Sequence, residues 1–561
     1  MTGHPRPEDM FGAATVPEVL ELAARGPRGI TFIDGNLRET PLPYRLLAAA
    51  ARRAATALAG LGVRRGDRVA MLSSTSPRLL ICLFGAWRAG AVPVVLAPPH
   101  RLSEVAVIMA DIRGRLDHVG ARCLVVADVF GGFVAGRIGA GRPVVTCGDL
   151  VAGRADDPPP IETCPNELAF LQYTSGTTGP AKAVALTHRQ LLTNVAVCCD
   201  RLLLDGEHSV HASWAPLYHD LGLVAVLSCV ASGIRMVLQP PEAFLSAPDS
   251  WLDALSRFRA TSTVTPNFAY GLAARSMRLR PRGLDLSALR VCGDGSEPTR
   301  KDAADEFTAR GARYGLRPEA LTPMYGLAEA TLSVSMGSLT EPMRWDHVRR
   351  DGLRPGGAAT PAPEAGPGTR TLAVCGTAVP GVDLSIRAED GTPLTDRVVG
   401  EICVRGPSVM RGYWRDREAT AAVMRDGWLR TGDLGYRTPA GLVLSGRLKD
   451  MIIIGGANLY PEDYEHVAAQ VDGVGAACAA FALPETERMV VAVEAHGGAD
   501  PGDLAERVMA RLRTEVGHAP DQVVVVRGQT IPLTSSGKVQ RGRCRDGYFH
   551  GRLPILARRA R

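Results

Sequence analysis

The chain has 561 residues, of which 46% are hydrophobic, 22% charged and 5% aromatic. This is the composition of a globular protein, and it excludes intrinsically disordered and collagen-like chains. The formal net charge of +6 is too small and too dispersed to indicate a nucleic-acid-binding protein. A basic run at the C-terminus, formed by Arg558, Arg559 and Arg561, is expected to be a solvated tail.

In chain order, the first element is an alanine-rich amphipathic helix predicted over residues 44–63. Short apolar runs at 68–74, 91–97 and 122–128 are bounded by glycine, proline or charged residues and are predicted strands. Helices and strands alternate, which predicts the α/β class with layered, largely parallel sheets. The charge-free run 221–234 has 14 residues. A membrane span needs about 20, so we expect this run in the buried core or in a pocket wall.

From about residue 370 onward the pattern is rich in β-strands. The pair Asp390-Gly391 separates two strand-like runs, which is a hairpin signal, and residues 428–447 repeat strand, turn and strand. Before this region, residues 354–370 are rich in proline, glycine and alanine and have no periodicity. We expect them to form a long surface loop or an insertion.

The last part of the chain has predicted elements of its own, including an apolar strand at 489–495 and an amphipathic helix at 504–517. It therefore predicts a small α+β domain with a boundary near Lys449. The expected architecture is α/β. A large N-terminal domain of layered sheets and helices, with a β-rich subdomain, covers residues 1–448, and the small C-terminal domain covers residues 449–561.

The cysteine pattern bears on the compartment. The twelve cysteines are scattered, without C-x-x-C or His/Cys metal spacing. Reduced structural thiols in a cytoplasmic protein are the simplest interpretation. The N-terminus lacks a basic segment followed by an apolar one, so the sequence predicts no signal peptide. We therefore expect a cytoplasmic location.

Lysine is rare in this chain. Only four of its 64 basic residues are lysines and the other 60 are arginines, so arginine serves as the ordinary surface cation. A lysine carries a compact charge on a flexible stem, whereas arginine carries a wide planar fork. Lysines retained against this bias are candidates for work that arginine cannot do. They are Lys182, Lys301, Lys449 and Lys538.

A glycine- and hydroxyl-rich segment at 171–188 is the strongest local signal. An apolar strand end is followed by small and hydroxyl-bearing residues, by one of the four lysines, and by a predicted helix that starts near Thr187. Small residues let backbone N–H groups converge on an anion, the hydroxyls add neutral donors, and the lysine adds positive charge, a combination that suits a polyphosphate. The spacing is not that of a Walker A loop. The alternative is a plain turn. The candidate phosphate-binding residues are Thr174, Ser175, Gly176, Thr177, Thr178 and Lys182.

Five ordered motifs resemble those of the adenylate-forming superfamily, which includes acyl-CoA synthetases, luciferases, adenylation domains and fatty acyl-AMP ligases. The resemblance runs from about residue 15 to about residue 550. The motifs are similar, in turn, to the phosphate loop, the adenine-side motif, the segment whose Asp holds the ribose, the hinge and the loop of the catalytic lysine. They are YTSGTTGPAK (173–182), MYGLAEAT (324–331), RTGDLGY (430–436), GRLKD (446–450) and LTSSGKVQRGRC (533–544).

Within the superfamily the chain is most similar to the fatty acyl-AMP ligases. SWAPLYHDLGL (213–223), TPNFAYGL (265–272) and DGSEP (294–298) resemble that branch, and Ala328 stands where most acyl-CoA synthetases carry Thr. Residues 354–370 lie where the branch has an insertion. In the family, this insertion is thought to limit domain rotation and to disfavour CoA as the acceptor.

The phosphate loop departs from the family pattern. It reads GPAKA, so that Ala181 and Ala183 stand where the family commonly has Pro and Gly. The change at Ala183 is harmless if this residue has a negative φ, and costly if it needs a positive one. The basic residue that the ligase branch often carries near Gly179 is also missing. These differences concern the phosphate contacts rather than the reaction class.

The resemblance implies a role for each matching residue. Lys538 would be the catalytic cation that bridges the acid and the α-phosphate, Glu329 would coordinate Mg²⁺, and Lys449 would stabilise one domain orientation at the hinge. Adenine and ribose would be bound by Gly295, Ser296, Glu297, Tyr325, Gly326, Asp433 and Arg447. The acyl pocket would be lined by His219, Phe268, Tyr270 and Gly271.

The implied function is that of a ligase that uses ATP and Mg²⁺ to convert a fatty or related carboxylic acid to acyl-AMP with release of pyrophosphate. The acyl group would then pass to the phosphopantetheine of an acyl carrier protein, as in polyketide or lipopeptide biosynthesis. An acyl-CoA synthetase is the alternative, against which residues 354–370 argue.

A third hypothesis is a degenerate nucleotide-binding or scaffold protein. Ala181 and Ala183 permit it, but Lys538 argues against it. A Ser-His-Asp hydrolase that uses His219 and Asp220 is disfavoured because no G-x-S-x-G elbow is present.

Overall fold

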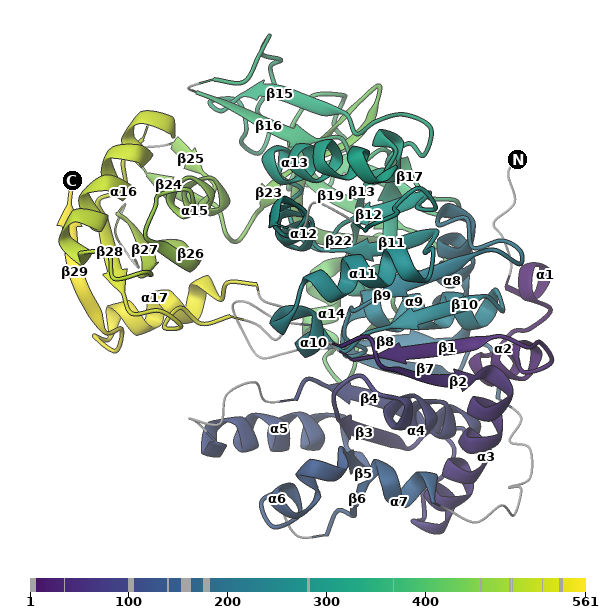
Figure 1. Cartoon of the computed structure of the whole chain (residues 1–561). Helices are drawn as coiled ribbons and strands as arrows, with labels where there is room; N and C mark the ends of the chain where they lie inside the picture. The colour runs from purple at the N-terminus through teal and green to yellow at the C-terminus, as the bar shows by residue number, and fades with distance from the viewer. Residues whose placement is uncertain are drawn as a thin grey trace.

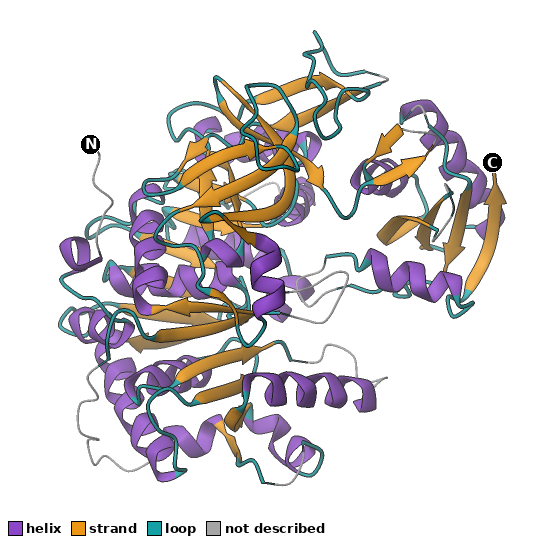
Figure 2. Ribbon diagram, turned by 180° about the vertical axis from the view of Figure 1, so that it is seen from behind, coloured by secondary structure: helices purple, strands orange, loops and turns teal. Residues whose placement is uncertain are grey.

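The computed structural model shows an α/β protein with a large N-terminal domain and a smaller C-terminal domain beside it (Figure 1). The two are joined by the segment that follows strand β23 (Gly441–Arg447). Helices flank the sheets of the large domain (Figure 2). The structure describes residues 7–34, 36–98, 105–138, 141–152, 163–174, 182–279, 283–366, 368–454, 457–483, 486, 488–516, 518–533 and 538–561.

A fully parallel sheet lies in the first part of the large domain, with the strand order β4-β3-β5-β6. The predicted apolar runs at 68–74, 91–97 and 122–128 are confirmed as three of its strands. These strands are buried along almost their whole length, which explains why the runs are continuously apolar. The strands are β3 (Arg68–Leu72), β4 (Val92–Leu96), β5 (Ala121–Val126) and β6 (Val144–Thr146).

Helices α3 (Tyr44–Gly60) and α4 (Pro77–Arg88) pack closely beside this sheet, and α3 confirms the predicted alanine-rich helix. Small residues allow the close approach: a Cβ added at Gly85 would lie 2.6 Å from the Cβ of Ala54. The indole of Trp87 then anchors α4, because it donates a hydrogen bond to the Ala169 carbonyl at 2.6 Å. The neighbouring helices are α5 (Val105–Val119), α6 (Gly131–Ala135) and α7 (Cys147–Val151).

The central sheet of the large domain has nine strands in the order β17-β14-β13-β12-β11-β9-β10-β1-β2. The six strands from β13 to β1 run parallel, and antiparallel strands close both edges. The strands are β1 (Gly29–Ile33), β2 (Glu39–Pro43), β9 (Val210–Ser213), β10 (Arg235–Leu238), β11 (Ser262–Thr265), β12 (Val291–Asp294), β13 (Leu321–Gly326), β14 (Ser333–Met336) and β17 (Thr377–Ala378).

Helices surround this central sheet. The apolar run at 221–234 lies mostly in α9 (Asp220–Ala231), which is buried on nearly all sides, as expected. None of the described helices has both the length and the apolar character needed to cross a membrane. The other helices here are α1 (Pro7–Phe11), α2 (Val16–Ala23), α8 (His188–Arg201), α10 (Pro241–Ser246), α11 (Asp249–Arg257), α12 (Asn267–Leu279) and α13 (Lys301–Gly311).

The β-rich part predicted after residue 370 is present. β18 and β19 are antiparallel, with the Asp390-Gly391 turn in their connection, and β22 and β23 form the second predicted hairpin. β15 and β16 form a separate antiparallel pair that flanks the predicted insertion. The elements are β15 (Trp345–Arg349), β16 (Thr369–Ala373), β18 (Asp383–Arg387), β19 (Gly400–Arg405), α14 (Arg417–Val423), β21 (Met424–Arg425) and β22 (Trp428–Thr438).

The C-terminal domain contains a four-stranded sheet in the order β26-β27-β28-β29. The expectation of a solvated C-terminal tail is wrong, because residues 555–560 form β29, which pairs antiparallel with β28. The elements are β24 (Ile452–Ile454), β25 (Ala457–Leu459), α15 (Pro461–Ala469), β26 (Val474–Ala482), β27 (Met489–Ala495), α16 (Pro501–Glu515), β28 (Gln522–Val526), α17 (Arg541–Phe549) and β29 (Ile555–Ala560).

The cysteines agree with the reduced state that the sequence predicts. All twelve are free thiols; eleven are buried and Cys164 is exposed. The eleven buried cysteines therefore act as small apolar core residues.

Candidate functional site

The predicted site residues gather at the carboxyl ends of the central parallel strands. β9 leads to His219, β11 to Phe268 and β12 to Glu297, while Tyr325 lies near the end of β13. The carboxyl ends of parallel strands meet at one edge of a sheet, so these residues come together although they are far apart in the sequence. Ligands of open α/β sheets bind at such an edge.

Asp433 lies at the centre of a hydrogen-bonded group of predicted nucleotide-binding residues. Its carboxylate accepts a hydrogen bond from the Tyr325 hydroxyl at 2.8 Å and from Nε of Arg447 at 2.7 Å. Asp433 and Arg447 are direct partners across the β22–β23 hairpin. Asp433 is only 4% exposed, and burial followed by its charge raises the pKa of Tyr325 well above its ordinary value. Three predicted residues therefore form one unit.

Glu329 is held by a residue that the sequence analysis missed. The hydroxyl of Tyr413 donates a hydrogen bond to the Glu329 carboxylate at 2.8 Å, and Nζ of Lys182 lies 4.8 Å from the centroid of the Tyr413 ring. Tyr413 belongs to β20 (Gly412–Tyr413), which pairs with β8 (Ala183–Thr187). Burial, followed by the charge of Glu329, raises the pKa of Tyr413, so its hydroxyl stays a donor. The tyrosine thus connects the predicted metal ligand with the predicted phosphate lysine.

Lys538 reaches from the C-terminal domain into this group of charges. Burial lowers the pKa of its ammonium, and so does the guanidinium of Arg447, whereas the carboxylates of Asp220, Glu297 and Asp433 act in the opposite direction. Charges of both signs therefore surround Lys538 at the strand ends. A cation placed there can stabilise negative charge that develops during a reaction.

Backbone N–H groups hold two of the carboxylates that face Lys538. Asp220 accepts a hydrogen bond from the N–H of Leu221 at 2.8 Å, and Glu297 accepts one from the N–H of Phe268 at 2.6 Å. Burial raises the pKa of both carboxyl groups, and Lys538 acts in the opposite direction. Glu297, which the resemblance assigns to the adenine side, therefore also lies within the electrostatic reach of Lys538.

His219 is neutral at this site. Burial, followed by the charge of Lys538, lowers its pKa to about 4. Its Nε2 atom is buried and has no hydrogen-bond partner among the residues that the structure describes. Its ring lies against Tyr218, with 5.4 Å between the centroids. A neutral imidazole suits the predicted place beside an apolar acid.

Tyr270 and Gly271 lie on α12. Tyr270 is 0% exposed, its ring centroid lies 4.8 Å from that of Phe307, and its hydroxyl donates to the Gly293 carbonyl at 2.8 Å. A Cβ added at Gly271 would make an ordinary contact with Ala303 at 3.7 Å. Both residues are therefore placed by helix packing, and their role as pocket wall stays a prediction.

Small residues let the backbone of neighbouring strand ends approach closely. A Cβ added at Gly295 would lie 3.0 Å from the Met324 carbonyl oxygen, and one added at Gly326 would lie 1.8 Å from the Leu332 carbonyl oxygen. Ser296 has a φ of +70° and is exposed. Substitution of Gly326 by any other residue would therefore force the backbone at this edge apart.

The glycine- and hydroxyl-rich loop connects two antiparallel strands, β7 (Leu168–Tyr173) and β8. Helix α8 begins only after β8, with Thr187 as its N-cap, so no helix N-terminus directly follows the loop. The Thr174 N–H donates to the Lys182 carbonyl at 2.9 Å, which closes the loop. Ala183 has a negative φ, so the change from the family pattern there is harmless. Outside the described residues lie Ser175, Gly176, Thr177, Thr178 and Ala181.

The C-terminal domain contacts the segments that flank the predicted insertion. Asp463 on α15 pairs with Arg370 on β16 at 3.0 Å, and also with Arg350, which follows β15. Arg370 is 9% and Asp463 14% exposed. Tyr460 donates from its hydroxyl to the Leu353 carbonyl at 2.9 Å, and the Arg370 guanidinium lies 4.4 Å from its ring centroid. These contacts define how the small domain sits on the large one.

Lys449 lies where the chain passes between the domains. Burial lowers its pKa, as does the guanidinium of Arg447, while the Asp450 carboxylate acts in the opposite direction. Asp450 itself pairs with Arg541 of α17 at 3.0 Å. The hinge motif is therefore tied to the helix that follows Lys538.

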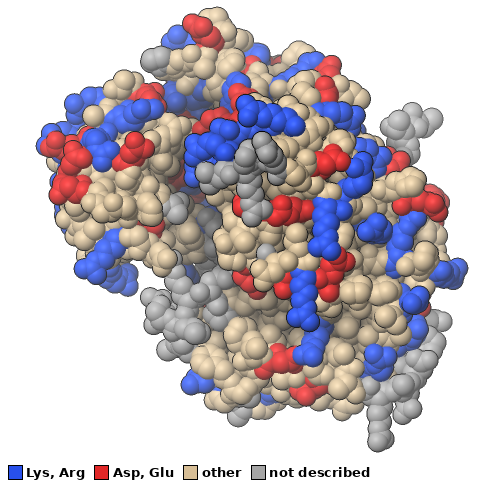
Figure 3. Space-filling view, in the orientation of Figure 1, with Lys and Arg blue, Asp and Glu red and all other residues tan. Residues whose placement is uncertain are grey.

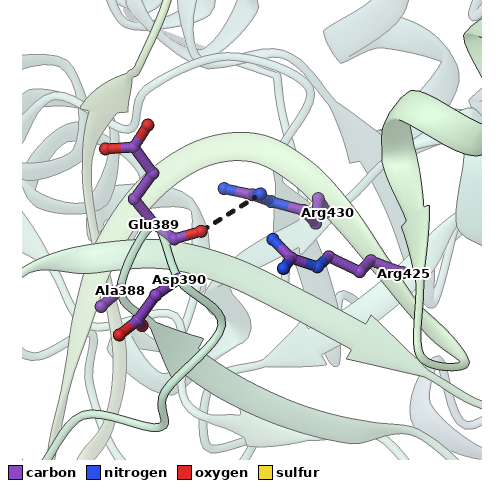
Figure 4. A pocket seen from close by; sticks show the side chains of 5 residues that line it. All are labelled: Ala388, Glu389, Asp390, Arg425 and Arg430. Carbon is purple, nitrogen blue, oxygen red and sulfur yellow. Dashed lines mark hydrogen bonds between the residues drawn. The ribbon is translucent and has the colours of Figure 1, made fainter.

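One pocket formed by described residues lies apart from these site residues. It is an open depression of about 560 Å³ on the β-rich part, lined by Ala388, Glu389, Asp390, Arg425 and Arg430. Figure 4 shows the guanidinium of Arg430 directed at the backbone carbonyl of Glu389, to which it donates at 3.4 Å. The lining of this pocket contains none of the predicted site residues.

Glu329 could hold Mg²⁺ only if a bound nucleotide and water completed the coordination of the ion. Among the described residues no group of three or more His, Cys, Asp and Glu side chains could hold a metal ion. Mg²⁺ in nucleotide sites usually takes one or two carboxylates and completes its shell with phosphate oxygens and water. One oxygen of Glu329 accepts the Tyr413 hydroxyl, and the carboxylate can still serve as such a single protein ligand.

Known proteins share this architecture. The model of the family described as AMP-binding enzyme matches residues 20–414. A solved structure from work on fatty acyl-adenylate ligases from E. coli and L. pneumophila is similar with a TM-score of 0.90 at 31% identity. That match covers 97% of this chain and 99% of the solved one.

Two relatives carry names that bear on the acceptor. A Moorena producens protein named medium-chain-fatty-acid–[acyl-carrier-protein] ligase JamA is 34% identical over 410 residues, which is 69% of this chain and 68% of its own. A Caulobacter vibrioides protein, provisionally named an acyl-CoA synthetase, is 35% identical over 553 residues, 96% of each chain. The match over residues 20–414, with a fold shared with fatty acyl-adenylate ligases, shows that this chain belongs to the AMP-binding enzyme family and is an adenylate-forming enzyme.

Proposed function

We propose that this enzyme activates a fatty or related carboxylic acid with ATP and passes the acyl group to the phosphopantetheine thiol of an acyl carrier protein. The observation that carries the proposal is the position of Lys538, which lies within electrostatic reach of Asp433, Asp220 and Glu297 at the strand ends. The likeness to fatty acyl-adenylate ligases and the name of the Moorena producens relative support the acid and the acceptor.

In the first step, a carboxylate oxygen of the acid attacks the α-phosphorus of ATP. A new P–O bond forms, the bond between the α-phosphorus and the bridging oxygen breaks, and pyrophosphate leaves. Two anions must meet, so the site has to supply positive charge where negative charge accumulates. Lys538 would supply this charge, while Asp433 would accept hydrogen bonds from the ribose hydroxyls and so orient the nucleotide.

Glu329 would hold the Mg²⁺ ion, and the ion would supply positive charge to the phosphates when bound. Tyr413 orients the Glu329 carboxylate by its hydrogen bond, and Lys182 lies on the face of the Tyr413 ring. Lys182 directly precedes strand β8, after the glycine-rich loop, where its ammonium can contact a phosphate oxygen. The chain thus offers one carboxylate for the metal and one cation for the phosphates.

In the second step, the carrier thiol attacks the carbonyl carbon of the acyl adenylate. The C–S bond forms, the bond between the carbonyl carbon and the phosphate oxygen breaks, AMP leaves, and the thiol proton passes to solvent. His219 cannot store this proton near neutral pH as a charged group, because its pKa is lowered to about 4. Its neutral ring would instead border the acyl chain.

Pyrophosphate release across a panel of carboxylic acids tests the first step, and the choice of acceptor tests the second. We expect acid-dependent release, and acyl transfer to a holo acyl carrier protein that is faster than transfer to CoA. Release that does not depend on any acid would contradict the proposal. Robust acyl-CoA formation with no transfer to carriers would instead establish an acyl-CoA synthetase, as the name of the Caulobacter vibrioides relative suggests.

The ion pairs of Asp463 should affect the adenylation step, although they lie outside it. Asp463→Asn removes the charge that pairs with Arg370 and Arg350. Loss of this partly buried contact should shift the small domain away from the orientation that brings Lys538 into the site, so we expect the rate of pyrophosphate release to fall about tenfold.

The matched control is Asp503→Asn, because Asp503 makes an exposed ion pair with Arg507 within helix α16. We expect this variant to keep the normal rate. The rate of acyl transfer from supplied acyl-AMP to the carrier protein is measured as well. Unfolding would lower both this rate and the rate of pyrophosphate release, whereas a changed domain orientation would not lower both equally. A uniform loss of both steps in Asp463→Asn, or no loss at all, would refute the role of this contact in domain orientation.

A further inference from the structure

The net positive charge of the chain is concentrated at its C-terminal end. Residues 541–561 contain seven arginines and one acidic residue, so this segment carries a net charge of +6. The other 540 residues carry 57 basic and 57 acidic side chains and are balanced. The expectation of a dispersed charge excess is therefore wrong, and one short segment accounts for all of it.

The structure places this charge on the last two elements of the small domain. The segment forms helix α17 and edge strand β29, which pairs with β28 on one side only. Arg541 is used internally, where it pairs with Asp450, Glu462 and Glu465. The other arginines form the C-terminal basic surface, which comprises Arg543, Arg545, Arg552, Arg558, Arg559 and Arg561.

Four of these six arginines have no acidic partner among the described residues. Arg543, Arg552, Arg558 and Arg561 are exposed and make no ion pair there, although the guanidinium of Arg558 lies over the Tyr548 ring. Arg545 contacts only the adjacent Asp546 at 3.2 Å, and Arg559 contacts Glu506 at 3.5 Å with both side chains more than half exposed. Such surface pairs contribute little and are easily exchanged for another anion.

An exposed aromatic residue lies within the same segment. Phe549, the last residue of α17, is 62% exposed, and its ring lies 5.4 Å from that of His550. Leu556 on β29 is 43% exposed. Aromatic residues and arginines are enriched at protein–protein interfaces. A surface that combines unpaired arginines with an exposed Phe therefore has the composition of a docking site.

Protection of the sheet edge does not explain this surface. Charged residues on an edge strand prevent pairing with other chains, which would account for Arg558 and Arg559 on β29. It does not account for Arg543 and Arg545, which lie on α17, or for Arg552, which lies in the turn between the two elements.

The position of the surface indicates what binds there. Helix α17 begins three residues after Lys538 with its first turn nearest the large domain, and it then runs along the lower edge of the small domain towards β29 at the outer edge (Figure 1). Figure 3 shows Lys and Arg side chains gathered at this lower edge of the small domain. A protein docked here would hold its reactive group near the site to which Lys538 belongs.

We infer that the C-terminal basic surface docks an acyl carrier protein through an acidic helix of that protein. This inference rests on the proposed function. Complementary charge would steer the carrier to the enzyme and set its orientation, and the exposed Phe549 would pack against its apolar residues. The phosphopantetheine thiol would then reach the acyl adenylate from the side of Lys538.

Charge reversal at Arg543 and Arg552 tests the inference in the full-length enzyme. We expect Arg543→Glu/Arg552→Glu to raise the KM for an acidic holo acyl carrier protein about tenfold and to weaken its dependence on salt. Acid-dependent pyrophosphate release and acyl transfer to free pantetheine should stay normal. The matched control is Arg313→Glu/Arg317→Glu, which reverses two exposed arginines of the large domain.

The outcomes separate this inference from the function on which it rests. If the unaltered enzyme transfers to neither pantetheine nor the carrier, the proposed function fails, and the docking inference fails with it. If it transfers to the carrier but the Arg543/Arg552 variant has the same KM, only the docking inference is overturned. Binding to vesicles of phosphatidylglycerol that the variant loses, with unchanged carrier kinetics, would assign the surface to anionic lipid instead.

Discussion

Lys538→Ala should lower the rate of acid-dependent pyrophosphate release about 10²- to 10³-fold, the loss that removal of a transition-state donor typically causes. The physical reason is that the ammonium lies at the strand ends, where under the proposed function the acid carboxylate meets the triphosphate. Steady-state release of pyrophosphate with saturating ATP and acid measures this effect.

Two variants serve as controls. Lys301→Ala removes another of the four lysines, which is paired with Asp305 on the surface of α13, and should leave the rate unchanged. Because the pKa of Lys538 is lowered from its ordinary value of 10.5, the unaltered enzyme should lose activity with rising pH before that value is reached. Lys538→Arg keeps its charge there, so its residual activity should show no such alkaline loss. A normal rate in Lys538→Ala would refute the mechanism.

Asp433→Asn should raise the KM for ATP about 10²-fold, which is the second largest effect that we expect. Under the proposed function the buried carboxylate accepts hydrogen bonds from the ribose hydroxyls, and hydrogen bonds to a charged group contribute about 1.5–3 kcal/mol each. The amide loses the charge and leaves Arg447, its partner at 2.7 Å, without an anion. Initial rates at varied ATP concentration measure the change.

The control for this variant is Tyr325→Phe. It removes only the hydroxyl that donates to Asp433 at 2.8 Å and keeps the aromatic ring. We expect a rise in KM of less than tenfold, because Arg447 and the ribose still satisfy the carboxylate. A KM for ATP in Asp433→Asn that equals the normal value, in a protein with a normal melting temperature, would remove Asp433 from the nucleotide site.

Local patterns in the sequence determined the elements. The alanine-rich helix at 44–63, the apolar strands at 68–74, 91–97 and 122–128, and the hairpin at 428–447 all occur in the structure. Such features depend on hydrophobic periodicity and turn chemistry, which are properties of neighbouring residues. The resemblance of five ordered motifs also identified the family, because each motif is contiguous.

The sequence misled us where the structure depends on contacts between distant segments. The C-terminal arginines were expected in a solvated tail, yet residues 555–560 pair with β28 and become the edge of a sheet. The charge excess was expected to be dispersed, although it lies in residues 541–561. An edge strand makes its inter-strand hydrogen bonds with a strand from another segment of the chain, and no local pattern encodes that partner.

By itself, the sequence determined the fold class and the family, and it predicted the segments that would carry the site. Only the tertiary structure decided that Tyr413 holds Glu329 beside Lys182, that Asp220 and Glu297 face Lys538, and that Asp463 joins the two domains. The reason is physical. A motif is read from adjacent residues, whereas these contacts join residues up to hundreds of positions apart, and only the packing of strands, helices and domains brings their side chains together.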